Sequence, residues 1–258
     1  MKAKKLAIPR AYQVIQQALE QAIITGDLEP GEQLPTETEL AEKFGVTRHT
    51  VREAMRVVEQ SGLVKREAGR RLHVVRPSHD ALALVTSRAL LMQRVTLREL
   101  WEIGTQIEMF SIDVAMSRLK PDLAEALAKN VDKMEKAVKA GEPITDLDME
   151  FHWIIAKATE NRAFHVSREA IAQLFFPALE QLYFLPKTKQ ESPRQVLEAH
   201  KKILDAIKAE DAEAARECMA KHMADFPRSF KQAGLDIDMP SEIRQVPTLA
   251  ISVPDFRK

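Results

Sequence analysis

Apolar residues recur every three or four positions in the segment 11–25, where Ile15, Leu19 and Ile23 fall on one face of a helix. Two shorter helices are predicted to follow. Each begins after a threonine that can cap it, Thr36 and then Thr47, and each ends at a glycine. The first of these threonines has a glutamate three residues on, which is typical of a capping box.

Strand spacing occurs only in the stretch "LVKREAGRRLHVV", which predicts two short strands joined by a tight turn at Gly69. From about residue 80 onward helical spacing dominates, and glycine is scarce. The predicted helices span 80–93, 97–118, 121–140, 145–158, 162–184, 193–208 and 211–233.

The order of these elements predicts a mainly α protein in three parts. Residues 1–76 hold three helices and a β-hairpin, the layout of a winged helix-turn-helix. Residues 80–235 form an all-α antiparallel bundle of six or seven helices. Residues 236–258 contain three prolines and no periodic pattern, so we expect a loosely ordered tail.

Composition narrows the class of protein without naming a function. Hydrophobic residues are 45% and charged residues 29%, and the formal net charge is zero, so overall charge points neither to nucleic acid nor to a membrane. The single cysteine, Cys218, excludes an internal disulfide. No apolar run approaches the length of a membrane span, and the basic start lacks the apolar run of a secretory signal. We therefore expect a cytoplasmic protein.

Hydrogen-bond donors gather at the start of the third predicted helix, where Thr47, Arg48, His49, Thr50 and Arg52 lie. In a helix-turn-helix this first turn enters the major groove of DNA, where an arginine can bind guanine through two hydrogen bonds. The hairpin adds further positive charge, because residues 65–76 hold five Lys or Arg against one Glu.

The stretch "GDLEPGEQLPTETELAEKFGVTRHTVREAMRVVEQSGLV" closely resembles the DNA-binding domain of GntR-family transcription regulators. The resemblance implies that Arg48, Thr50 and Arg52 contact DNA, with Thr47 and His49 beside them. It also implies a wing with Gly69, Arg70 and Arg71 at its tip, although relatives carry a second glycine where Arg71 stands. The alternative is a winged helix that binds protein and carries its arginines as surface charges.

The second half holds histidines at positions that can converge. Asp148 and His152 lie four residues apart on one predicted helix, and His200 and His222 lie near the apolar stripes of two others. Three imidazoles and one carboxylate suit Zn²⁺, Ni²⁺, Mn²⁺ or Fe²⁺ and leave coordination positions open. By spacing alone, each histidine taken separately is more often a hydrogen-bonded core residue.

Residues 80–233 resemble the ligand-binding domain of the FadR subfamily of these regulators, the FCD domain. The pattern comprises Asp-x-x-x-His in "DMEFH", a histidine in "EAHKKILDAIKAEDAEAA" and a late histidine in "ECMAKHMADF". The resemblance implies that Asp148, His152, His200 and His222 are metal ligands. They would anchor a small effector, with a carboxylate the first expectation.

Three further residues are expected near the effector. Relatives carry Glu-x-Arg-x-x-Leu-Glu in the first long helix, where the arginine helps hold a carboxylate; here "WEIGTQIEMF" puts Gly104 in its place and keeps Glu108. The effector is therefore either a carboxylate without this clamp or a larger, less acidic molecule that uses the space at Gly104. Asn161 matches a family asparagine near the pocket, and its alternative role is a helix cap.

Other polar and aromatic residues are expected to have structural roles. His165 and Arg168 are predicted on a solvated helix face, with pocket lining as the alternative. Seven aromatic residues are predicted to be bundle core rather than an effector pocket: Trp101, Phe110, Phe151, Trp153, Phe164, Phe175 and Phe176.

Together these features predict a ligand-responsive transcription regulator. We expect a homodimeric repressor on a palindromic operator, released by a small organic acid bound at the metal. A metal-dependent enzyme is the rival, but no separate general-base motif, Gly-rich phosphate loop or nucleophile elbow is present. A purely structural metal site is the third possibility. The effector, the operator sequence, the metal and the sign of regulation stay open.

Overall fold

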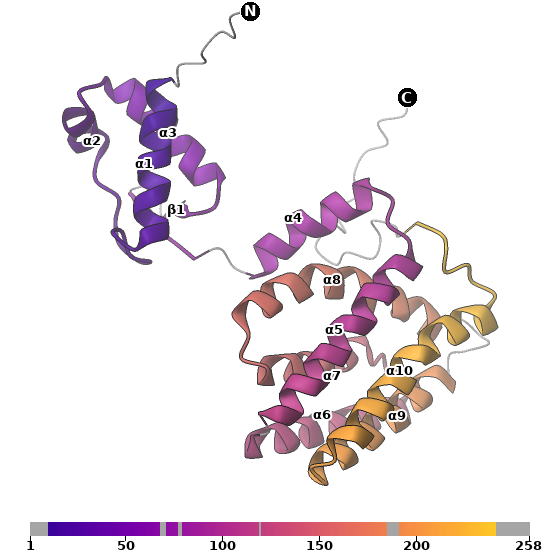
Figure 1. Ribbon diagram of the computed structural model, residues 1–258. Helices are drawn as coiled ribbons and strands as arrows, with labels where there is room; N and C mark the ends of the chain where they lie inside the picture. The colour runs from indigo at the N-terminus through magenta and orange to yellow at the C-terminus, as the bar shows by residue number, and fades with distance from the viewer. Residues whose placement is uncertain (1–9, 68–70, 77–78, 119, 185–190, 241–258) are drawn as a thin grey trace, which may run out of the picture. The chain divides into compact units, whose positions relative to one another are not determined.

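The computed structural model describes residues 10–67, 71–76, 79–118, 120–184 and 191–240. The chain separates into two compact units, Met1–Ser78 and His79–Lys258, each of which is described by itself (Figure 1). Among the described residues, no helix is both long enough and apolar enough to cross a membrane.

The first unit contains three helices and one hairpin, as the sequence predicts. They are α1 (Ala11–Thr25), α2 (Glu37–Phe44), α3 (Arg48–Gln60), β1 (Val64–Arg66) and β2 (Leu72–Val74). The strands pair antiparallel with Val64 opposite Val74. Thr36 accepts a hydrogen bond from the Glu39 amide at 3.2 Å and the Glu39 carboxylate accepts one in return, which closes the predicted capping box.

The second unit contains seven helices within the described residues. They are α4 (His79–Met92), α5 (Leu97–Ser117), α6 (Pro121–Ala140), α7 (Thr145–Ala158), α8 (Arg162–Phe184), α9 (Glu191–Lys208) and α10 (Ala212–Ala233). The prediction of an all-α bundle is confirmed, and no helix end differs from its predicted position by more than two residues.

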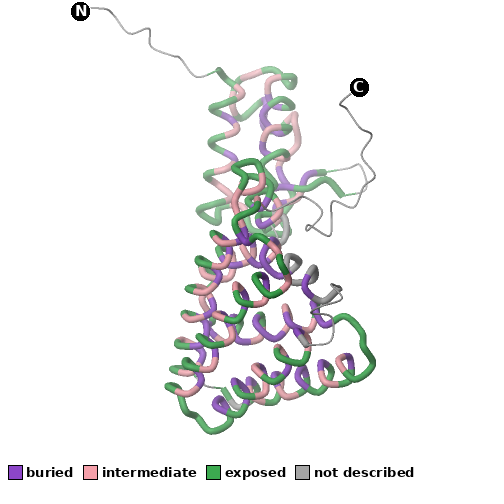
Figure 2. The backbone as a smooth tube through the Cα atoms, turned by 90° about the vertical axis from the view of Figure 1, so that its right-hand side faces the viewer, coloured by how far each residue is buried: buried purple, intermediate pink, exposed green. Residues whose placement is uncertain are grey.

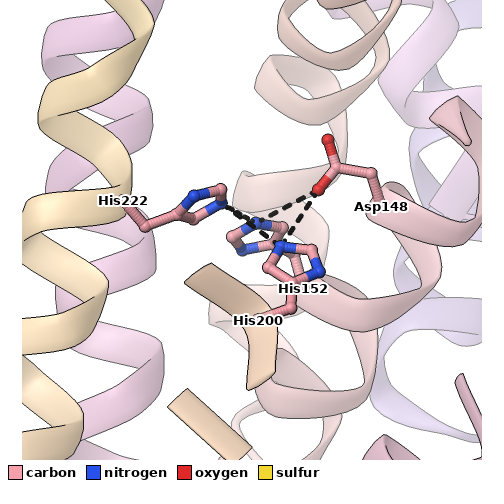
Figure 3. Close-up of side chains that lie close together, drawn as sticks. All are labelled: Asp148, His152, His200 and His222. Atoms are coloured by element: carbon pink, nitrogen blue, oxygen red, sulfur yellow. Dashed lines mark hydrogen bonds and ion pairs between the residues drawn. The ribbon is translucent and has the colours of Figure 1, made fainter. Parts of the chain in front are cut away.

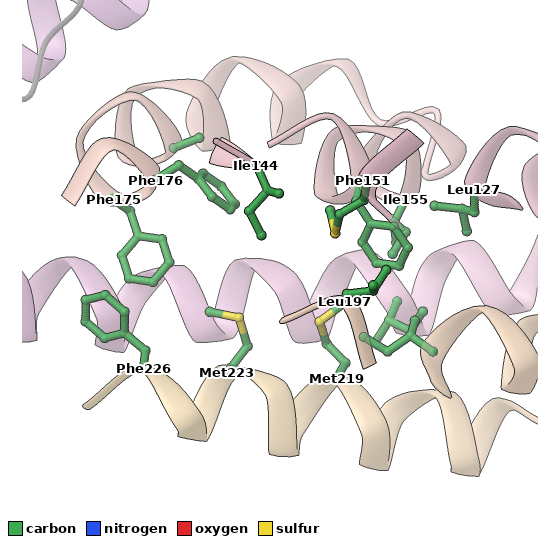
Figure 4. Packing of buried hydrophobic residues seen from close by; sticks show 14 of the residues in the cluster. Leu127, Ile144, Phe151, Ile155, Phe175, Phe176, Leu197, Met219, Met223 and Phe226 are labelled. Carbon is green, nitrogen blue, oxygen red and sulfur yellow. The ribbon is translucent and has the colours of Figure 1, made fainter. Parts of the chain in front are cut away.

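Helix α5 packs against α7, α8 and α10. Helix α9 packs between α10 and α6, and α4 packs against α8. Buried and exposed stretches alternate along these helices, as expected for amphipathic segments around one core (Figure 2). Phe151, Ile155 and Met219 are fully buried in that core (Figure 4). This packing brings residues of α5, α7, α8, α9 and α10 close together in the interior of the second unit.

Residues 236–240 contact the start of α5. The amide of Arg98 donates to the carbonyl of Ile237 at 3.0 Å, and its guanidinium pairs with Asp238 at 2.5 Å. Ile237 is buried. The tail predicted from residue 236 thus begins with five residues held against α5, and the rest of it, 241–258, lies outside the described residues.

Helix α10 continues through an internal proline, Pro227. Proline has no N–H, so the carbonyl four residues earlier, that of Met223, receives no hydrogen bond from within the helix. The indole Nε1–H of Trp101, on α5, donates to this carbonyl at 2.7 Å. A side chain from a neighbouring helix therefore satisfies the acceptor that the proline leaves without its helical donor.

Candidate functional site

Four candidate metal ligands converge between three helices of the second unit. Asp148 and His152 lie one turn apart on α7, His200 comes from α9 and His222 from α10 (Figure 3). One potential ligand atom from each lies within 4.8 Å of all the others. The spacing predicted from the sequence therefore corresponds to one cluster rather than to separate core histidines.

Three of the distances within the cluster match those between ligands of one ion, and a fourth, from Nε2 of His152 to Oδ1 of Asp148, is longer at 3.7 Å. The Nε2 atom of His222 lies 3.2 Å from Nε2 of His152 and 3.3 Å from Nε2 of His200. The Nε2 atom of His200 lies 3.2 Å from Oδ1 of Asp148. Ligand atoms about 2.1 Å from a zinc-like ion, at tetrahedral or octahedral angles, are separated by about 3.0–3.4 Å. The donor set therefore fits a divalent transition metal.

The tautomer of His152 supports the same assignment. Its Nδ1 lies 2.8 Å from a carboxylate oxygen of Glu108, on α5, within a buried pair. A carboxylate accepts hydrogen bonds, so Nδ1 carries the proton and Nε2 presents a lone pair to the cluster. A carboxylate behind a metal-binding histidine fixes the ring and raises its basicity. Glu108, predicted to bind the effector, thus contacts the Nδ1 side of His152, away from the cluster.

His200 is held differently. Its ring stacks on Phe151 at 3.8 Å between centroids and 7° between planes. No hydrogen-bond partner for its Nδ1 is found among the described residues. On the Nδ1 side, packing rather than a hydrogen bond therefore holds this imidazole, while its Nε2 faces Asp148 and His222.

Protonation states in the cluster suit metal binding. Burial lowers the pKa of His222 well below its ordinary value, and it lowers the pKa of His200 although Asp148 opposes the shift. Burial alone would raise the pKa of Asp148, but the hydrogen bond from His200 and the nearby imidazoles outweigh it, so the pKa falls. Neutral imidazoles and an ionised carboxylate are the forms that bind metals.

A small cavity with a free volume of about 50 Å³ lies beside the cluster and has an open mouth. Its described lining residues come mainly from α8, α9 and α10: Asp148, His152, Phe175, Phe176, Leu182, Ser192, Gln195, Val196, His222, Met223, Asp225, Phe226 and Ser229. A surface groove between α9 and α10 shares Gln195, His222, Asp225 and Ser229 with it, so the cavity is accessible from solvent. A small molecule that enters here meets the cluster directly.

The first turn of α3 presents polar side chains to solvent. Arg48 and His49 are exposed, while apolar Val51 is fully buried in the core of the first unit. Thr47 caps the helix by accepting a hydrogen bond from the Thr50 amide at 3.3 Å. The cap fixes the backbone of the turn that carries the two exposed donors.

Two of the arginines predicted to contact DNA also have partners within the first unit. Arg52 on α3 pairs with Glu37 on α2 at 2.7 Å, through both Nε and Nη2. This pair braces the two helices of the motif against each other. Arg71 donates to Gln33 at 3.1 Å. Gly69 and Arg70, at the predicted hairpin tip, lie outside the described residues.

Comparisons with known proteins match both units. Residues 11–74 match the bacterial regulatory proteins of the gntR family, and residues 99–225 match the FCD domain. The chain is 30% identical to the Uxu operon regulator of Haemophilus influenzae, over 84% of this chain and 80% of that protein. This chain belongs to the GntR family.

Two further comparisons agree with that assignment. The chain is 24% identical to the transcriptional repressor NanR of Escherichia coli over 86% of its length and 85% of that protein. The solved structure of Streptococcus agalactiae GntR matches with a TM-score of 0.63 and 27% identity, covering 84% of this chain and 99% of that one. The protein is a GntR-family transcription regulator with an FCD domain. Its relatives are transcription regulators, which agrees with the expectation that it is not an enzyme.

Arg168 of this GntR-family regulator lies in the core, and the prediction of a solvated position is wrong. Its side chain is 4% exposed and donates to Glu108 at 3.0 Å. Its guanidinium also lies 5.8 Å from the centre of the Phe176 ring. Burial raises the pKa of Glu108, but His152 and Arg168 outweigh it, so the pKa is lowered and the carboxyl stays ionised. Arg168 thus holds the carboxylate that orients His152.

The two other predicted effector residues of the regulator are not among the described residues lining the cavity. Gly104 is buried, and a Cβ there would lie 3.9 Å from the ring of Phe175, so a methyl group fits but a long side chain displaces that ring. Asn161 accepts a hydrogen bond from the Phe164 amide at 3.1 Å, the geometry of a helix cap.

Of the seven aromatic residues, Trp101 and Phe164 are partly buried, and the other five divide into three groups. Phe151 is core, as predicted. Phe175 and Phe176 are buried and also line the cavity, so both of their predicted roles apply. Phe110 and Trp153 are 43% and 45% exposed, so the prediction that they are core is wrong.

Proposed function

We propose that this GntR-family regulator is a ligand-responsive repressor that binds a palindromic operator as a homodimer. A small carboxylate, anchored at a divalent transition metal (Zn²⁺, Ni²⁺, Mn²⁺ or Fe²⁺) held by Asp148, His152, His200 and His222, releases it from DNA. The convergence of these four donors on a solvent-connected cavity carries the proposal.

On DNA, the exposed start of α3 enters the major groove. Arg48 and His49 contact base edges or phosphates there, and Thr50 lies beside them. Arg52 contacts the phosphate backbone while its ion pair with Glu37 holds its side chain near α2. Gly69, Arg70 and Arg71 of the wing contact the adjacent backbone or minor groove. A two-fold operator calls for two such heads, which is the argument for a homodimer.

In the second unit, the chain's own residues build the receptor. Three imidazoles and one carboxylate would hold the metal, and the coordination positions that they leave open would accept an effector. The bound metal supplies a positive centre that attracts and orients a carboxylate. Glu108 and Arg168 hold His152 in position, and the walls of α8 and α10 exclude water from behind the effector.

Release from DNA requires the effector to bind the two states of the protein with different affinity. By the reciprocity of linked equilibria, operator DNA must then weaken effector binding by the same factor. A coupling of about 5- to 150-fold is typical of such systems. Effector titrations with and without operator measure both sides of this relation.

A purely structural metal site is the second candidate function of the cluster. A cavity that reaches the cluster and opens to solvent favours sensing, because a structural ion needs no access path. Water exchange at the bound ion separates the two. A closed coordination shell without exchangeable water would favour the structural role.

The decisive experiment measures metal and operator binding in the same protein, purified without a histidine tag. Metal content by elemental analysis is expected near one ion per chain, and it should fall strongly in His200→Ala. His165→Ala is the matched control, because His165 contacts Thr159 and lies outside the cluster. Equal metal content in His200→Ala and the unaltered protein removes His200 from the site.

The regulatory half is tested by fluorescence anisotropy on DNA from the upstream promoter, with small acids titrated into the complex. A specific, salt-dependent complex that at least one acid dissociates is the expected result. Failure to bind this DNA refutes the DNA-binding half, and failure of every acid to change operator affinity refutes the sensing half.

A further inference from the structure

The cavity beside the metal cluster has apolar walls. Phe175 and Phe176 contribute from α8, and Met223 and Phe226 from α10 (Figure 4). Val196 contributes from α9. The rings of Phe175 and Phe226 lie 4.7 Å apart between centroids, which places α8 and α10 in direct contact at this point. Such walls favour an apolar body, because burying a hydroxyl group against the apolar side chains, without a hydrogen-bond partner, costs free energy.

Most polar groups of the cavity belong to the metal cluster or to the mouth, and His222 belongs to both. Asp148, His152 and His222 belong to the metal cluster. Gln195, Asp225 and Ser229 also line the outer groove, so they mark the mouth. Ser192 is the one further polar residue of the described lining. A molecule with a single anionic end and an apolar remainder matches this arrangement.

The charges around the cavity limit the number of acidic groups that it accommodates. No lysine or arginine is among the described lining residues, and the one charged residue there outside the metal cluster is Asp225. The buried side chains Asp148 and Glu108 each carry a charge of −1, and the buried Arg168 carries +1, so their net charge is −1. A bound divalent ion would change this net charge to +1. One carboxylate balances that charge. A second would lie near Asp225, with which Arg228 of the outer groove already pairs at 2.9 Å.

We propose that the effector is a monocarboxylate with a compact apolar body, such as a branched aliphatic or aromatic acid, rather than a polyhydroxylated acid or a dicarboxylate. The inference rests on the proposed function, because the carboxylate is anchored at the metal of the same site. Its body lies against Phe176, Val196 and Phe226.

Three acids of six carbons test this choice at matched size. They are 4-methylpentanoate (apolar body), gluconate (hydroxylated body) and adipate (second carboxylate), with acetate as the reference without a body. Binding to the zinc-loaded full-length protein is measured by calorimetry. A methylene group transferred to an apolar wall raises affinity about 3- to 4-fold, so 4-methylpentanoate is expected to bind at least about tenfold more tightly than acetate. Gluconate and adipate are expected to bind no more tightly than acetate.

Val196→Thr locates the apolar body, because threonine has nearly the same shape and adds one hydroxyl to the wall. The preference for 4-methylpentanoate over acetate is expected to fall about fivefold, while zinc content and acetate affinity stay unchanged. Val138→Thr is the matched control, since Val138 is a partly buried residue of α6 that does not line the cavity. It should leave the preference unchanged.

The outcomes separate this inference from the function on which it rests. Tighter binding of gluconate or adipate than of 4-methylpentanoate overturns the inference and leaves a metal-anchored carboxylate intact. An unchanged preference in Val196→Thr overturns the placement of the body in this cavity. If no acid, acetate included, binds the zinc-loaded protein, the proposed carboxylate sensor itself is refuted.

Discussion

The candidate DNA-binding side chains of the first unit are mostly exposed, whereas the candidate metal ligands of the second unit are mostly buried. At the start of α3, Arg48 and His49 stand exposed on a capped helix. In the second unit, Asp148, His152 and His200 are buried almost completely. A DNA duplex binds as a large surface, so the protein groups that contact it can remain hydrated until binding. A small ion has to be enclosed by donors that are already dehydrated and oriented.

This difference predicts how each unit responds to substitution. Replacing an exposed group should change binding and leave folding intact. Replacing a buried charged group should change both, because its partners remain buried without compensation. The predictions below test that contrast, from the largest expected effect to the smallest.

Arg168→Met should lower the free energy of unfolding by about 3–5 kcal/mol, because it leaves the Glu108 carboxylate buried without its guanidinium. Urea denaturation in the presence of a chelator measures the loss without a contribution from metal binding. The double variant with Glu108→Gln should recover most of it, since both charges are then absent. A double variant as unstable as the single one would show that lost packing against Phe176, not charge, is responsible.

Removing the metal should lower the stability of the second unit. An ion present at 100 times its dissociation constant stabilises the folded state by about 2.7 kcal/mol. For a domain of this size that corresponds to a fall of about 5–10 °C in Tm, followed by calorimetry before and after dialysis against a chelator. The first unit, which contains none of the cluster residues, should show no change. Equal shifts in both transitions would contradict the separation of roles.

Arg48→Ala should weaken specific operator binding by about 1–3 kcal/mol, since one arginine–base contact is worth that much. Its thermal unfolding should not change, because the side chain is exposed and the helix keeps its Thr47 cap. Anisotropy and calorimetry on one sample measure the two quantities. Arg56→Ala, on the same helix but two turns from its start, serves as the control and should keep nearly full operator affinity.

Thr36→Ala should destabilise the first unit by about 1 kcal/mol, because it removes the cap of α2 and half of the capping box. The variant tests whether Thr36 acts on DNA binding only through the stability of α2. If it does, operator affinity falls only as far as the folded fraction falls. A larger loss of affinity at full folding would mean that Thr36 itself lies at the DNA interface.

The fold was predictable from sequence because its signals are local. Helix ends follow from caps such as Thr36 and Thr47 and from apolar spacing within one segment. Half of the candidate site is also local, since Asp148 and His152 lie one turn apart. That His200 and His222 reach the same point depends on the packing of α9 and α10, which spacing does not give; the family resemblance supplied it.

The contacts that escaped prediction join distant segments. Arg168 and Glu108 are 60 residues apart, and an arginine within a helix looks like a surface residue until its buried partner is known. Phe110 and Trp153 show the reverse error, because an aromatic residue at helical spacing does not reveal which face another helix covers. Asn161 was correctly identified as an alternative helix cap, since that signal again is local.

The hydrogen bond from Trp101 to the Met223 carbonyl gives this regulator a built-in optical reporter. Met223 lines the cavity, so an occupant changes the electric field and the packing around the indole, and its emission maximum should shift. Trp153, the other tryptophan, is partly exposed on α7, and iodide can quench it selectively. Ligand entry can therefore be followed by fluorescence in unlabelled protein.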